Sequence, residues 1–176
     1  MTNKDSLAVP IKWFSKFTFE NFRYVLFENS VIPNLLISII VAVSVTVITL
    51  LLAVPTSYAL ARYKWNFNET TFFFILTTRM GAPIAFGVPY YMLASKLNLL
   101  DTYPLIITIY LLMNLGFAIW ILKGFFEGIS KELDEVAFLQ GATKPKSFMY
   151  IDFPLAKNGI AVAGIFTFMF TWNDYF

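Results

Sequence analysis

The stretch from Asp134 to Pro154 holds the residues whose types and spacing are most informative about the chemistry of this chain. It is the longest charged stretch between two apolar segments that are each long enough to cross a bilayer. Carboxylates stand at its beginning, Gly141 lies near its middle and a proline closes it. A polar segment in this position predicts a membrane protein on which a soluble partner acts from one face.

The first part of this stretch predicts a short helix. Ser130 can cap it, and the carboxylates that follow favour the positive end of the helix dipole. Three apolar side chains fall at helical spacing and predict a common apolar face: Leu133, Val136 and Ala137. Such an amphipathic helix is suited to a groove in a partner protein.

The second part predicts another short helix at an angle to the first. Gly141 can end the first helix in a left-handed conformation. Thr143 can then cap the second helix, and Pro145 is acceptable in its first turn. Pro154 marks the return toward the membrane. We therefore expect a small rigid knob, although an ordinary solvated loop would also account for the charges.

Residue types that most chemistry requires are missing from the sequence. The chain has no Cys and no His, which removes disulfides, thiol chemistry and the usual zinc and haem ligands. It has no phosphate-binding G-x-x-x-x-G-K-[ST] loop, and the nearest segment, 141–147, lacks the second Gly. No basic patch indicates a nucleic-acid partner. We expect no catalytic residue, no cofactor, no metal and no enzymatic activity in this chain.

The elements that position the loop are predicted to be transmembrane helices. Of the 176 residues 58% are hydrophobic and 14% are charged, against about a quarter in soluble domains; the mean hydropathy is +0.67. Residues 29–61, 102–122 and 158–173 carry no charge. A soluble bundle would show a polar stripe on its helices, and residues 35–52 show none. The predicted fold class is an all-α membrane protein, a polytopic transmembrane helix bundle.

We expect about four spans, near residues 33–61, 70–93, 103–126 and 158–176, the last of them incomplete. They form one transmembrane domain over residues 31–176. Residues 1–30 are predicted as a separate extramembrane segment, either an amphipathic stretch on the membrane surface or a partly ordered tail. The connections on the side of residues 123–157 carry seven Lys and Arg against five on the other side, which favours a cytoplasmic position for the polar loop.

Two polar residues inside the apolar runs are candidates for a transport pathway. Arg79 lies about ten residues into the second span, and an ionisable residue at such depth is a functional candidate. A structural bond to a backbone carbonyl is the equal alternative. Asn114 lies in the middle of the third span.

The polar loop resembles the EAA loop of ABC-importer permease subunits. That pattern is Glu-Ala-Ala, three residues, Gly, nine residues, Ile, one residue, Leu, Pro. This chain matches its spacing, with Val136 for Ala and Phe153 for Leu. The residues that carry the resemblance are Glu135, Ala137, Gly141, Ile151 and Pro154. Segments 58–62, 78–80, 88–91, 100–102 and 172–174 are similar to the carbohydrate-importer branch, the MalG-like subunits.

The resemblance implies a permease subunit in the cell membrane with several partners. These are a second permease subunit, a dimer of cytoplasmic ATP-binding-cassette ATPases, an extracellular substrate-binding protein and membrane lipid. ATP hydrolysis would belong to the partner, and the loop would pass its closure to the transmembrane helices. Members of this branch have six spans, so the chain resembles a fragment. An ion-coupled secondary transporter is the alternative function, and an intramembrane enzyme lacks an evident nucleophile and base.

Overall fold

The computed structural model describes residues 31–63, 66, 68–80 and 83–175, without the side chains of 78–80, 83–86, 174 and 175. All regular structure in these residues is helical, which confirms the predicted fold class. The extramembrane segment expected over residues 1–30 lies outside them. The chain divides into two units, Met1–Ile40 and Val41–Phe176. The described part of the first unit is the beginning of helix α3.

Helix α3 (Val31–Arg62) realises the first predicted span and extends it by a residue or two at each end. Pro55 lies inside it, yet the helix continues to Arg62. The hydroxyls of Thr56 and Ser57 donate to the carbonyls of Leu52 and Ala53, each at 2.7 Å, beside the hydrogen bond that the proline cannot make. Side-chain hydroxyls of this kind let a helix at membrane depth tolerate a proline.

In the described residues, the second predicted span comprises two helices. Residues 70–93 are divided between α4 (Asn68–Met80) and α5 (Pro83–Lys96), of 13 and 14 residues. A straight span needs ~20 residues, so neither helix reaches across a bilayer alone. Pro83 begins α5, where its fixed backbone angle and missing N–H suit a first turn.

The third predicted span is α6 (Tyr103–Glu127), and the fourth is α10 (Lys157–Tyr175). Among the described residues, α3 and α6 are long and apolar enough to span a membrane by themselves. A third span is obtained if Lys144–Leu155 and Lys157–Asn173, bent by 70° at their junction, count as one. The described residues thus supply two or three spans where the sequence predicted about four.

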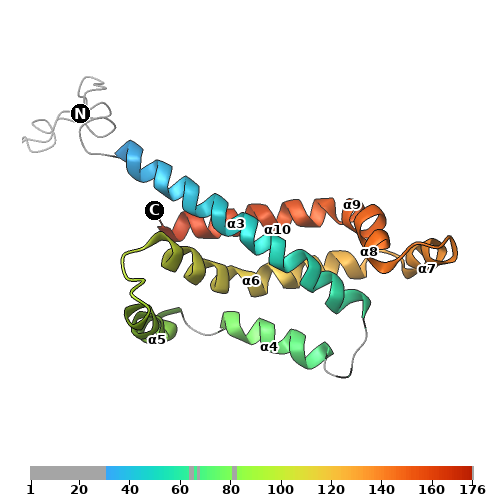
Figure 1. Cartoon of the computed structure of the whole chain (residues 1–176), viewed down its shortest axis with the longest axis horizontal. Coiled ribbons are helices and arrows are strands. Elements are labelled where there is room, and N and C mark those ends of the chain that lie inside the picture. The colour runs from blue at the N-terminus through green and yellow to red at the C-terminus, as the bar shows by residue number, and fades with distance from the viewer. Residues whose placement is uncertain (1–30, 64–65, 67, 81–82, 176) are drawn as a thin grey trace, which may run out of the picture. The chain divides into compact units, whose positions relative to one another are not determined.

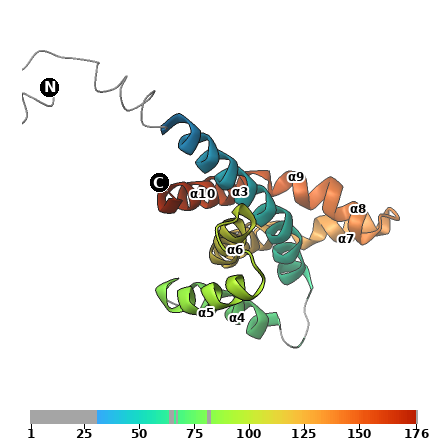
Figure 2. The ribbon, with the colours of Figure 1, turned by 60° about the vertical axis from the view of Figure 1, so that its left-hand side comes forward.

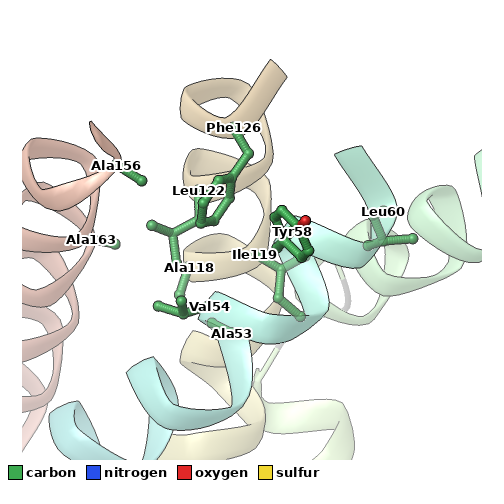
Figure 3. Packing of buried hydrophobic residues seen from close by; sticks show 10 residues of the cluster. All are labelled: Ala53, Val54, Tyr58, Leu60, Ala118, Ile119, Leu122, Phe126, Ala156 and Ala163. Atoms are coloured by element: carbon green, nitrogen blue, oxygen red, sulfur yellow. The ribbon is translucent and has the colours of Figure 1, made fainter. Parts of the chain in front are cut away.

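Within the second unit, α6 is the central helix. It packs against α10 on one side and α4 on the other, as two views show (Figures 1 and 2). Figure 3 shows the buried cluster that joins α3, α6 and α10, in which Tyr58 and Phe126 are the largest side chains. Two small residues, Ala163 of α10 and Ala156 just before it, face α6 and let the two helices approach closely.

Candidate coupling loop

The first helix of the polar loop is α7 (Lys131–Leu139), and it begins where the sequence predicted. Ser130 is the N-cap, and its hydroxyl oxygen accepts a hydrogen bond from the backbone N–H of Glu132 at 3.3 Å. Glu132 and Asp134 lie in the first turn, close to the free N–H groups at the positive end of the helix. The predicted cap is confirmed.

Gly141 ends α7 in the predicted conformation. Its φ is +83°, in the left-handed region that residues with a side chain rarely adopt. The N–H of Ala142 donates to the carbonyl of Ala137 at 2.9 Å, which closes the end of the helix. A Cβ at Gly141 would meet no atom within 4 Å, so only the backbone conformation requires glycine here.

The second part of the loop is a broken helix rather than a simple one. It comprises α8 (Lys144–Ser147), the π-helical turn η2 (Phe148–Asp152) and α9 (Phe153–Leu155). Thr143 occupies the N-cap position of α8, as expected, but its side chain makes no capping hydrogen bond. A π-helical turn inserts one extra residue and is frequent at functional sites.

The faces of α7 differ from the prediction. Ala137 is buried, but its buried neighbour one turn earlier is the carboxylate Asp134 rather than an apolar residue. Leu133 and Val136 are exposed. The three apolar residues therefore do not share one face. The inward face carries a charge, and the outward face carries an unpartnered apolar strip that continues to Leu139, which is 88% exposed.

The five residues of the EAA pattern occupy different environments. Glu135, Gly141 and Pro154 are exposed, Ile151 is half-buried and Ala137 is buried. The structure thus brings Glu135 and Gly141 to the outer surface of the knob. Their role in coupling to an ATPase stays a prediction.

One guanidinium holds the loop to the end of α3. Arg62 Nη2 donates to Asp152 Oδ1 at 2.6 Å, and Nη1 donates to the carbonyl of Ile129 at 3.0 Å. Arg62 Nε lies 3.1 Å from Asp134 Oδ2. That N–H is not aimed at the oxygen, so this ion pair is a charge–charge contact rather than a hydrogen bond. Ser147 donates to the other Asp134 oxygen at 2.5 Å.

This cluster is buried and holds more negative than positive groups. The side chains of Arg62, Asp134 and Asp152 are 6%, 10% and 0% exposed. Burial raises the pKa of Asp152 above its ordinary value, the bond to Arg62 opposes that shift, and the nearby Asp134 reinforces it. Asp152 Oδ2 has no hydrogen-bond partner among the described residues. Burial and the second carboxylate thus raise the pKa of Asp152, and the arginine lowers it.

Sequence reasoning missed this cluster. In the sequence, Arg62 follows the first predicted span and belongs to segment 58–62, and Asp152 takes the unspecified position between Ile151 and Phe153 in the family pattern. An isolated charge next to a membrane boundary was the available signal, at Arg62 and again at Asp152. Their separation of 90 residues left nothing in the local pattern to pair them.

The two pathway candidates are placed differently. Asn114 is buried in α6, where its Nδ2 donates to the carbonyl of Tyr110 at 2.8 Å and lies 3.4 Å from Thr171 Oγ1 of α10. Arg79 belongs to α4, but its side chain lies outside the described part of the structure. A role of either residue in a pathway therefore stays a prediction.

Membrane-length helices joined by a buried ion-pair cluster and an exposed helical loop define a multi-pass α-helical membrane protein. The family described as "Binding-protein-dependent transport system inner membrane component" matches residues 32–176. The chain belongs to this family and is a multi-pass component of the plasma membrane.

Sequence relatives agree with this family assignment. The trehalose transport system permease protein SugB of Mycobacterium tuberculosis is 32% identical over 98% of this chain and 62% of its own length. The maltodextrin transport system permease protein MdxG of Bacillus subtilis is 26% identical, over 97% and 62%. The diacetylchitobiose uptake system permease protein NgcG of Streptomyces coelicolor is 26% identical, over 96% and 56%. The chain therefore spans about three fifths of the length of these relatives.

Proposed function

We propose that this chain is part of a permease subunit of an ATP-driven, binding-protein-dependent importer. A second permease subunit completes the translocation path, an extracellular binding protein delivers the substrate, and membrane lipid surrounds the spans. The substrate is a sugar, which the names of the trehalose and maltodextrin relatives support.

The observation that carries the proposal is the exposed apolar strip on the loop. Leu133, Val136 and Leu139 recur every three residues along α7, and Tyr150 of η2 is 80% exposed nearby in the sequence. Apolar side chains gathered on a polar loop mark a surface that another protein covers. A short helix with such a strip is suited to a hydrophobic groove. The occupant we propose is a cytoplasmic ATPase, present as a dimer.

Energy conversion is assigned to the partner. The loop presents carboxylates and apolar groups, and the chain has no phosphate-binding loop with which to hold ATP itself. We therefore propose that this subunit is not an enzyme. Its loop residues Glu135, Ala137, Gly141, Ile151 and Pro154 act in coupling, and Arg79 and Asn114 remain the candidates for the pathway.

Purification of the full-length protein from its native membrane tests the proposal. A tagged subunit should retain an ATPase, and substrate uptake should stop when ATP is depleted while ion gradients are kept. Glu135→Lys should lower both ATPase retention and uptake. The matched control is Lys146→Gln, a change of one charge on the exposed part of α8. Uptake that survives ATP depletion would instead support an ion-coupled secondary transporter.

A further inference from the structure

The buried cluster at the base of the loop joins elements that the family pattern does not connect. Arg62 ends α3, Asp134 lies in α7, Asp152 ends η2 and Ile129 lies between α6 and α7. The loop is covalently continuous with α6 and α10, but not with α3. The loop and the connection before it therefore meet α3 through non-covalent contacts, three of which are made by the Arg62 guanidinium.

We propose that Arg62 is a positioning residue that fixes both halves of the loop to the end of α3, so that displacement of the loop is passed to α3 as well. This inference rests on the proposed function and specifies how the loop would act. Arg62 touches no substrate and no nucleotide in this scheme. It acts through the two aspartates that it holds.

The geometry of the guanidinium favours this role over that of a single ion pair. Its planar fork has donors in several directions, and here it donates to one carboxylate and one carbonyl and makes a charge contact with a second carboxylate, all from separate elements. Lysine presents one compact charge and cannot hold three elements at fixed angles. Ser147 extends the connection, because its hydroxyl binds Asp134 from α8.

The π-helical turn is what brings Asp152 to the arginine. Asp152 is the last residue of η2 and is fully buried. In an α-helix each residue turns by about 100°, so removing the extra residue of the π turn would rotate Asp152 away from its present direction. The wider turn therefore has a specific consequence: it aims a carboxylate at the end of α3.

Aromatic contacts reinforce the same junction. Tyr58 lies one turn before Arg62. Its ring centroid is 4.6 Å from the ring centroid of Phe148 in η2 and 5.6 Å from that of Phe126 in α6. Lys144 Nζ of α8 lies 4.8 Å from the ring of Tyr63, just after α3. Side chains in close contact transmit a displacement from one element to the next, because little free volume is left between them to absorb it. The end of α3 and the loop are thus expected to move as one body.

The test uses the full-length subunit in its intact complex. Arg62→Gln should retain the ATPase and its hydrolysis rate but lower the substrate transported per ATP by about tenfold, the scale of a typical coupling between sites. Arg62→Lys should recover part of the loss, because it restores the charge. Glu127→Gln, which breaks the exposed pair with Lys123, is the control and should transport normally. An Arg62→Gln protein that transports within about twofold of wild type per ATP would overturn the proposal.

A distance measurement keeps the proposal falsifiable if Arg62→Gln does not fold. Residues 1–176 contain no cysteine, so in a complex whose other cysteines have been replaced, spin labels can be attached at Ala59→Cys in α3 and Lys146→Cys in α8. Their separation should be the same in the nucleotide-free and ATP-bound complex. A change of more than about 5 Å, the size of a one-turn shift, would show that the loop moves independently of α3. Loss of the ATPase from the wild-type complex would instead refute the proposed function.

Discussion

Arg62 Nη2 lies 2.6 Å from Asp152 Oδ1, and this contact joins the end of α3 to the final residue of η2 across 90 positions of sequence. Both side chains are almost completely buried, although both stand at the boundary of a membrane helix. A buried ion pair contributes little net stability compared with apolar packing, but it strongly penalises the loss of one partner. We therefore interpret the Arg62–Asp152 pair as an interaction that fixes one arrangement of the loop rather than as a source of stability.

Replacing Arg62 by methionine should strongly destabilise the protein. The change leaves two buried carboxylates without their cation, and breaking a buried pair in this way costs about 3–5 kcal/mol. Thermal unfolding in detergent would measure it. Glu127→Gln should cost less than about 0.5 kcal/mol, because its pair with Lys123 is exposed. An equal loss of stability in Arg62→Met and Glu127→Gln would contradict the view that Arg62 neutralises two buried carboxylates.

Adding Asp152→Leu to Arg62→Met should recover part of the lost stability. The second change removes one of the carboxylates that the first leaves unpaired, so the two effects should not be additive. A double-mutant cycle of unfolding free energies measures the coupling. Strict additivity would mean that the arginine and the aspartate do not interact.

Stability should depend on pH through Asp152. Its pKa is raised from 3.8 in the folded protein by burial and by Asp134, against the effect of Arg62. The folded state then binds this proton more tightly than the unfolded state. The resulting stabilisation is fully present below pH 3.8 and is lost as the pH rises through the folded-state value. The Asp152→Asn variant mimics the protonated acid. The stability of this variant relative to wild type should therefore increase as the pH rises from 3.8 through the folded-state pKa of Asp152. A difference that does not vary with pH would contradict the assignment.

The effect of a substitution at Gly141 should depend on the backbone preference of the new residue rather than on the size of its side chain. Its Cβ position is open, but its φ of +83° costs a β-branched residue more than asparagine. Gly141→Asn should therefore couple nearly as well as wild type in an uptake assay, and Gly141→Val should reduce uptake. Equal loss in both variants would indicate that the partner's surface, rather than the turn, requires glycine.

Gly159 should not tolerate even alanine. A Cβ there would overlap Phe125 Cγ and lie 2.8 Å from Phe125 Cβ, and these atoms are close to the backbone of α6 and cannot move aside easily. Overpacking of this kind costs about 1–3 kcal/mol. Gly124→Ala is the control, because its Cβ would meet nothing within 4 Å. Thermal unfolding should show a lower midpoint for Gly159→Ala alone.

Short-range patterns predicted much of this molecule. The uncharged runs located α3 and α6, because a helix in lipid needs a continuous apolar surface and satisfies its backbone internally. Ser130 and Gly141 predicted the limits of α7, because caps depend on residues within one turn. The loop spacing also predicted the family that the match over residues 32–176 confirmed.

The tertiary structure decided what local pattern could not. It divided the second predicted span into α4 and α5, and it turned Asp134 inward while Leu133 and Val136 stayed exposed. It also inserted the π turn that aims Asp152 at Arg62. Helical periodicity predicts that a residue lies on a face, but not what that face will meet. The partner of a buried charge is set by packing between distant segments, so only the folded chain could pair this arginine with its two carboxylates.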